Sequence, residues 1–177
     1  MKLLIPGLCA VCLVLAEDIK SLPNQAGNGN IDLAGNAFVD PKEVQQILGI
    51  SMPAGYVVVK IRVSPRTAQA IRISADDFSI VSRKDGERSP ALLPTQIAAP
   101  PSLALRTGKA TPVEPGDARK SPDSPLLKLL ESKLLPDTET KEPVEGLLYF
   151  LLDGKNKPKD LGLLYKGAAG RLAMDFK

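Results

Sequence analysis

The chain has 177 residues, of which 44% are hydrophobic and 24% are charged, as expected for one globular domain with additional segments. The formal net charge of +3 lacks the basic excess of a nucleic-acid-binding domain, so we expect no nucleic-acid partner. Histidine is absent and the cysteines are Cys9 and Cys12, which excludes most nucleophilic triads and transition-metal sites from the rest of the chain.

Residues 1–16 have the pattern of a removable signal peptide. Lys2 supplies the charged start, residues 3–15 form an apolar run, and Val14 and Ala16 form a small-residue cleavage site. The run is shorter than the roughly 20 residues that span a bilayer, although a retained membrane anchor is the alternative. We expect cleavage to remove both cysteines and to leave an exported protein, periplasmic or extracellular, with no stable membrane insertion.

Residues 17–30 are rich in Asn and Gly, so they have little apolar surface to bury, and we predict a flexible leader. From Ile31 onward the apolar residues alternate with other side chains, as in a half-buried strand. A short helix is predicted next, because Asp40 stands at an N-cap position, Pro41 at the first helical position and Gly49 just after the last turn.

The clearest strand is predicted over residues 56–64, where valine and isoleucine alternate with polar side chains. The segments 70–74 and 78–82 show the same alternation. Asp85 and Gly86 then predict a tight turn, because both residues tolerate a positive φ. These patterns indicate a series of short strands joined by turns.

Residues 88–124 contain proline at frequent intervals, and each proline removes a backbone donor. We predict a mobile Pro-rich insertion here, in which residues 92–97 form an edge segment. A second short helix is predicted over residues 126–135, opened by Pro125 and stopped by Pro136. An isolated helix this short is marginal in water, and we favour docking on its own sheets over docking in a partner's groove.

Strands return in the C-terminal third of the chain. Residues 146–152 are apolar at both odd and even positions, which is typical of a strand covered on both faces. Residues 161–166 and 171–177 alternate, and Gly167 and Gly170 bracket a hairpin loop between them.

Together these elements predict that residues 31–177 form a mainly β domain, an immunoglobulin-like antiparallel β-sandwich of about seven strands with two short helices and one long insertion. Residues 55–89 and 145–177 resemble secreted bacterial immunoglobulin-like domains of the telokin-like group, in which a D-F strand is followed by a K-P-x-D-L-x-L-x-Y strand. The residues that carry this last element are Lys157, Pro158, Asp160, Leu161, Leu163 and Tyr165. The resemblance implies an immunoglobulin-like fold and export, and it carries over no catalytic or binding residue.

Isolated polar residues offer little catalytic chemistry. Ser82 near Lys84 is interpreted as a solvated turn rather than a Ser-Lys pair. Asp76 and Asp77 are interpreted as a local cap rather than as calcium ligands, and Asp153 does not complete a spaced acidic loop. We therefore expect no metal, no cofactor and no enzymatic activity.

Basic residues near the C-terminus are the candidate partner contacts. We expect a run of three lysines to lie close to two further cations across the last hairpin, where they would meet an acidic polymer or anionic headgroups. A solvated loop is the simpler interpretation, because Asp153 and Asp160 flank the run. The candidates are Lys155, Lys157, Lys159, Lys166 and Arg171.

The function that we expect from the sequence is that of an exported, non-catalytic binding or accessory module of the cell envelope or secretome. One alternative is a structural component that assembles by edge-strand pairing. A carboxylate-based hydrolase is the least favoured hypothesis.

Overall fold

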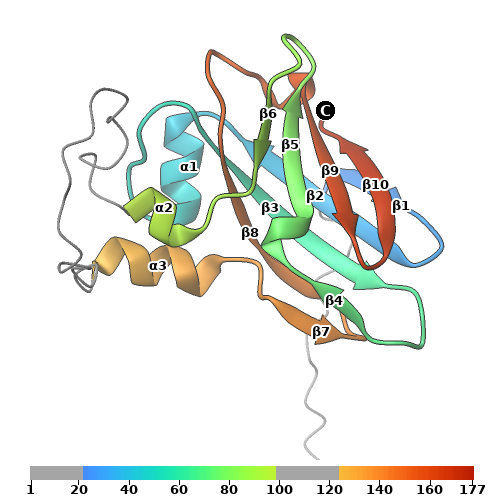
Figure 1. The fold of residues 1–177 in the computed structure, drawn as a ribbon. Helices are drawn as coiled ribbons and strands as arrows, with labels where there is room; N and C mark the ends of the chain where they lie inside the picture. Colours follow the sequence, from blue (N-terminus) through green and yellow to red (C-terminus); the bar gives the residue numbers. More distant parts are fainter. Residues whose placement is uncertain (1–21, 99–123) are drawn as a thin grey trace, which may run out of the picture.

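Ten strands form three antiparallel sheets in the computed structural model of the protein, which describes residues 22–98 and 124–177 (Figure 1). The first sheet has the order β1-β2-β3-β8 and contains β1 (Asn24–Gly27), β2 (Ile31–Phe38), β3 (Tyr56–Pro65) and β8 (Val144–Leu151). The second has the order β10-β9-β5-β6 and contains β10 (Gly170–Asp175), β9 (Leu161–Gly167), β5 (Phe78–Ser82) and β6 (Arg88–Pro90). The third is a two-stranded ribbon of β4 (Ile71–Ile73) and β7 (Thr138–Thr140).

Three α-helices accompany the sheets in the described residues, α1 (Pro41–Leu48), α2 (Pro94–Ala98) and α3 (Pro125–Lys133), with short 3-10 turns at η2 (Ala75–Asp77) and η4 (Pro158–Asp160). The prediction of a mainly β, antiparallel domain is confirmed. The number of strands exceeds the expected seven, and there is one helix more than expected. The predicted signal peptide, residues 1–16, lies outside the described residues.

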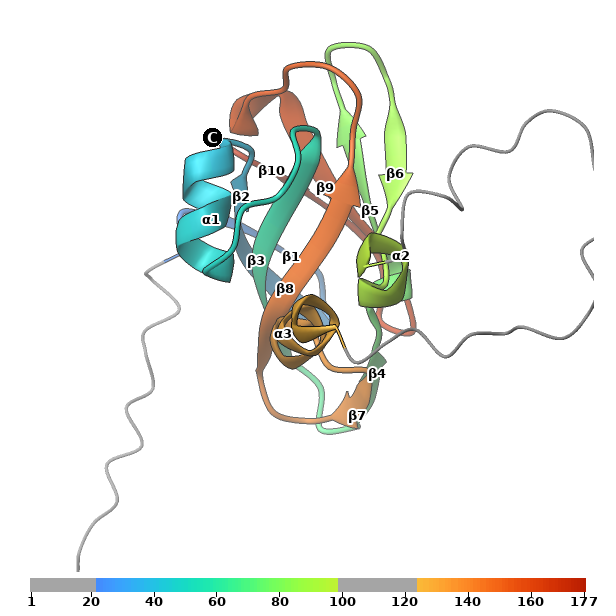
Figure 2. The same ribbon diagram turned by 90° about the vertical axis from the view of Figure 1, so that its left-hand side faces the viewer.

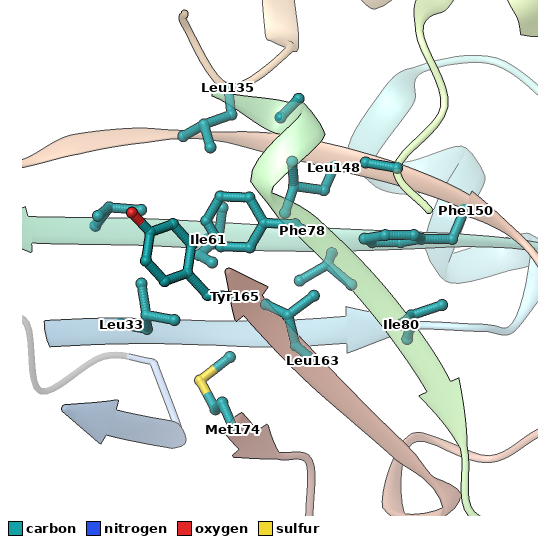
Figure 3. Packing of buried hydrophobic residues seen from close by; sticks show 14 of the residues in the cluster. Leu33, Ile61, Phe78, Ile80, Leu135, Leu148, Phe150, Leu163, Tyr165 and Met174 are labelled. Carbon is teal, nitrogen blue, oxygen red and sulfur yellow. The ribbon is translucent and has the colours of Figure 1, made fainter. Parts of the chain in front are cut away.

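The main core lies between the first and second sheets. Figure 3 shows Leu33 and Ile61 of the first sheet facing Leu163, Tyr165 and Met174 of the second, and all five side chains are buried. The alternation predicted along β3 is confirmed, because every second residue of that strand enters this core.

A second core covers the outer face of the first sheet. Val58 and Tyr149 point away from the main core and pack against Val44 of α1 and Leu130 of α3. The two helices lie along this face of the sheet (Figure 2). Residues 147–150 of strand β8 are therefore buried on both faces, as its continuous apolar sequence predicts.

The signals predicted to bound α1 are confirmed. The Asp40 carboxylate accepts a hydrogen bond of 2.8 Å from the backbone N–H of Lys42, and Pro41 occupies the first turn. Gly49 ends the helix with a φ of 81°, a left-handed conformation that glycine adopts without strain. Helix α3 is also confirmed, and it docks on the protein's own sheet through the buried Leu130.

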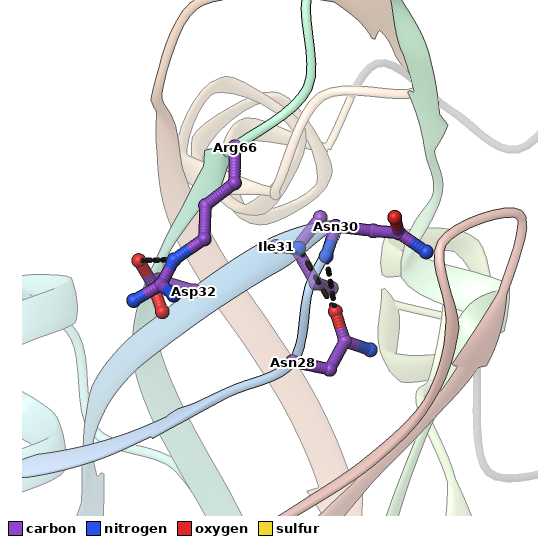
Figure 4. A network of polar contacts seen from close by, with 5 residues as sticks. All are labelled: Asn28, Asn30, Ile31, Asp32 and Arg66. Carbon is purple, nitrogen blue, oxygen red and sulfur yellow. Dashed lines mark hydrogen bonds and ion pairs between the residues drawn. The ribbon is translucent and has the colours of Figure 1, made fainter.

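The prediction of a flexible leader is wrong for its second half, because β1 pairs with β2. Hydrogen bonds of asparagine side chains stabilise this segment, which has little apolar surface to bury. The buried Asn24 amide donates to the carbonyl of Gly35 at 3.1 Å. In the following turn the Asn28 side-chain oxygen accepts from the backbone N–H groups of Asn30 and Ile31 (Figure 4). Residues 17–21 lie outside the described residues.

The prediction of a mobile insertion over 88–124 is wrong for its first part. Residues 88–90 form β6, and of the edge segment expected over 92–97 only Leu92 bonds to the edge of β8, because the short helix α2 begins at Pro94. The side chain of Gln96 accepts a 2.8 Å bond from the Leu93 N–H at the start of this helix. Ile97 packs on the second core, so the segment has apolar surface to bury. Residues 99–123 lie outside the described residues.

Candidate functional site

The structure divides the predicted basic cluster into two places. Lys155, Lys157 and Lys159 lie in the loop between β8 and β9, whereas Lys166 and Arg171 pair in the hairpin between β9 and β10. Figure 1 shows this loop and this hairpin at opposite ends of β9. At the usual rise per residue the strand separates them by about 17 Å, so the prediction that all five lie close together is wrong.

The first place is a pocket of about 500 Å³, here called the end pocket, between the N-terminal end of α1, the start of β3 and the β8–β9 loop. Its apolar residues are Val39, Pro41, Ala54, Tyr56, Val57 and Leu152. Lys155 and Lys157 supply its cations and Asp40 its carboxylate, whereas Lys159 does not line it. The pocket thus combines an apolar interior with two lysines from one loop.

The loop that carries these lysines is held by side chains from the β5–β6 hairpin. The Ser82 hydroxyl, which is buried, donates to the side-chain oxygen of Asn156 at 3.1 Å. Both carboxylate oxygens of Glu87 accept from the Asp153 N–H at 3.1 Å.

Bonds within the loop complete this arrangement. The Asn156 amide donates to the Asp153 carbonyl at 3.1 Å, and the Lys157 N–H donates to the Asp160 carboxylate at 3.3 Å. Leu152 closes the base of the loop by donating its N–H to the Gly55 carbonyl at 3.0 Å. The lysine backbone is therefore fixed before any ligand arrives, which lowers the entropic cost of binding.

The opposite wall of the end pocket carries a carboxylate that already has a structural role. Asp40 caps α1 by accepting from the Lys42 N–H, and capping places its negative charge at the positive end of the helix. The lysine side of the pocket therefore offers the cationic contacts, and the Asp40 side is occupied by the helix cap.

The second place is a shallow depression of about 470 Å³ on the outer face of the second sheet, here called the basic groove. Lys166 and Arg171 line it, as does Arg88 from β6, which sequence reasoning did not connect with them. Leu164 and Ala173, which are opposite each other in the register of β9 and β10, lie between the cations. Only the pairing of β5 with both β6 and β9 brings Arg88 to this face.

The acidic turn at Asp76 and Asp77 behaves as the predicted local cap. The Asp77 carboxylate accepts from the Ser74 N–H at 3.3 Å, and burial raises the pKa of this carboxyl above its usual range. Among residues 22–98 and 124–177, no group of three or more His, Cys, Asp or Glu side chains is arranged to hold a metal ion. None of the helices within those ranges is both long and apolar enough to span a bilayer.

Comparison with protein-family models, with curated proteins and with solved structures found no match to this chain. The resemblance to secreted immunoglobulin-like domains therefore stays a prediction.

Proposed function

We propose that this protein is an exported, non-catalytic binding or accessory module of the cell envelope or secretome, and that the end pocket is its ligand site. The observation that carries the proposal is the pair Lys155 and Lys157, held by a hydrogen-bonded loop over an apolar interior. Its volume of about 500 Å³ lies within the range of small-molecule sites, which are mostly apolar with a few fixed polar groups.

The ligand class follows from this arrangement. An apolar interior favours a hydrocarbon or aromatic body, and two lysine ammonium groups favour a carboxylate or phosphate at one end of it. Asp40 disfavours a second negative charge on the α1 side of the pocket. The proposed ligand is therefore a small amphiphile with one anionic end, or the anionic end of a larger envelope component.

Three six-carbon probes test this proposal: hexanoate, hexanol and hexylamine. We expect hexanoate to shift the backbone amide resonances of Gly55, Gly154 and Asn156, and hexanol and hexylamine to bind more weakly. The variant K155Q/K157Q is expected to weaken hexanoate binding by about three- to tenfold, the range for two exposed ion pairs. The matched control K84Q/K141Q removes the same charge elsewhere and is expected to bind normally. Equal binding of hexanoate and hexylamine would refute the proposed chemistry.

Export is supported by the sequence pattern of residues 1–16 and is tested separately. Fractionation of the native cells, followed by mass measurement of the purified protein, is expected to find a chain beginning at Glu17 outside the cytoplasm. An intact chain that retains Cys9 and Cys12 would contradict export by this route.

The immunoglobulin-like form of the sandwich belongs to this proposal, and the strand order supports it. In such domains A, B and E are neighbours in one sheet, and G, F and C are neighbours in the other, sometimes extended by C′. The orders β2-β3-β8 and β10-β9-β5-β6 follow the same sequence of neighbours. An experimental structure in which β3 does not pair with β8 would overturn the assignment.

Assembly through an exposed edge strand has less support. The outer edge of β8 already accepts hydrogen bonds from Leu92 to Tyr149 at 2.7 Å and from Leu135 to Leu147 at 3.0 Å. In the second sheet, the edge strand β6 has three residues and includes Pro90, which has no N–H to donate. These two edges therefore offer no long row of hydrogen-bonding groups to another chain, and the other edge strands of the two sheets are the four-residue β1 and the six-residue β10.

A further inference from the structure

The two sheets differ in what covers their outer faces. Helices α1 and α3 and the second core cover the first sheet, whereas no described helix lies over the outer face of β9 and β10 (Figures 1 and 2). On that face Leu164 is half-buried and Ala173 is exposed. The face is therefore open to a partner along the whole basic groove.

The cationic side chains on this face differ in whether they form an ion pair. Arg83 forms an ion pair with Asp175 across Gly162, where the missing side chain leaves room for it. Among the ion pairs of the described residues, none involves Arg88, Lys166 or Arg171, and all three residues are exposed. The groove therefore presents three cations around a small apolar centre.

From this arrangement we propose that the basic groove binds an extended segment of an acidic protein. Arg88 is opposite Val81, and Val81 is opposite Gly162, so Arg88 lies two strands from β9 and four residues along it from Lys166. With standard strand spacing and rise, the Cα atoms of Arg88 and Lys166 are about 16 Å apart.

An extended chain directs every second side chain to the same surface, and residues four apart are about 13 Å apart. An acidic residue at position i can therefore meet Arg88 while another at i+4 meets Lys166 and Arg171. An apolar residue at i+2 then lies over Ser79 of β5 and beside Leu164 of β9, which are opposite each other in the register and both line the groove. The motif that fits is acidic-x-apolar-x-acidic.

The experiment uses a fluorescently labelled peptide with Glu at i and i+4, Leu at i+2 and uncharged spacers, together with a Gln-for-Glu control peptide. We expect the acidic peptide to bind the full chain and the Gln peptide to bind at least tenfold more weakly, measured by fluorescence anisotropy. Raising the salt concentration is expected to weaken the acidic peptide's binding, because exposed charges are screened.

The variant R88Q/K166Q/R171Q is expected to raise the Kd of the acidic peptide by about tenfold or more, as three exposed ion pairs would. The variant K60Q/K84Q/K141Q loses the same charge from exposed positions elsewhere and is expected to change the Kd less than twofold. The circular dichroism spectra of both variants should match the wild type. Amide shifts on peptide binding should appear at Leu164 and Ala173 and not at Gly55 and Gly154, which separates this surface from the end pocket.

Two results would overturn the proposal. If both triple variants weakened binding equally, or if neither did, the groove would not be the site. Tighter binding of polygalacturonate than of the acidic peptide, lost in R88Q/K166Q/R171Q, would assign the groove to an acidic polysaccharide instead.

Discussion

The hydroxyl group of Tyr149 donates a 3.1 Å hydrogen bond to the backbone carbonyl of Leu130, and both residues are fully buried. Leu130 lies in the last turn of α3, where carbonyl groups lack partners within the helix. The N–H of Leu134, which would bond to this carbonyl in a longer helix, goes instead to Glu131 at 3.3 Å. Strand β8 thus supplies the missing donor from beneath the helix.

Tyr149→Phe should therefore lower the free energy of unfolding by about 1–3 kcal/mol, because a buried carbonyl loses its partner while the ring remains. Urea denaturation measures this loss, and an unchanged m-value would show that the unfolded state is not altered. Tyr56→Phe is the comparison, and a smaller loss is expected because that tyrosine is half-buried and water can replace a lost bond. An effect of Tyr149→Phe within error of zero would contradict the role of this bond.

Alkaline pH should destabilise the protein through its buried tyrosines. Burial raises the pKa of both Tyr149 and Tyr165 above the ordinary value of 10.0. Above pH 10 the unfolded chain loses protons that the folded chain keeps, so stability is lost as pH rises, by up to about 1.4 kcal/mol per pH unit for each tyrosine. Tyrosinate absorbance from these two residues should rise together with the loss of the circular dichroism signal. In Tyr149→Phe the slope above pH 10 should become shallower, because one of the two buried tyrosines is removed, and an unchanged slope would count against this assignment.

Local patterns were sufficient to predict the elements that lie at the centre of the fold. Strand β3 and strand β8 follow from alternation and from continuous apolarity, since each pattern matches the faces that the strand buries. Helix α1 follows from Asp40 and Gly49, because caps act on backbone groups within a few residues. The lysines of the end pocket are close in sequence, so their common loop was also predictable.

Elements held by distant polar partners were not predictable from local sequence. The N–H of Lys177 donates to the side chain of Asn24 at 2.9 Å, and Asn28 donates to the carbonyl of Ala169 at 3.2 Å. These bonds stabilise β1 from the other end of the chain, and no apolar alternation signals them. The basic groove was missed for the same reason, because Arg88 reaches Lys166 only through the register of three strands.

Lys133 should stabilise the contact between α3 and α1. Its ammonium group donates to the carbonyls of Ile47 at 2.5 Å and Leu48 at 3.4 Å, at the negative end of the α1 dipole. Lys133→Met keeps most of the aliphatic stem and removes the donor, so we expect a loss of about 0.5–2 kcal/mol in thermal or urea unfolding. Lys42→Met, an exposed lysine at the other end of α1, should change stability by less than about 0.5 kcal/mol. Equal losses in the two variants would indicate a general effect of lysine removal.

Gly146 should be the glycine least able to accept a side chain. A Cβ at this position of β8 would overlap the Cα of Leu135 and lie 2.5 Å from its backbone nitrogen, where the chain leaving α3 crosses the strand. The obstacle is backbone, and the backbone is held there by the 3.0 Å bond from Leu135 to the Leu147 carbonyl, so it cannot move aside without losing that bond. Gly146→Ala should therefore lower the free energy of unfolding by about 3 kcal/mol or more, at the upper end of overpacking effects, and should loosen α3 from the sheet.

Gly29→Ala is the matched control, since a Cβ there meets nothing within 4 Å, and its midpoint of urea unfolding should stay close to that of the wild type. A Gly146→Ala protein that unfolds at the wild-type midpoint would mean that the segment after α3 does not cross β8 at this residue.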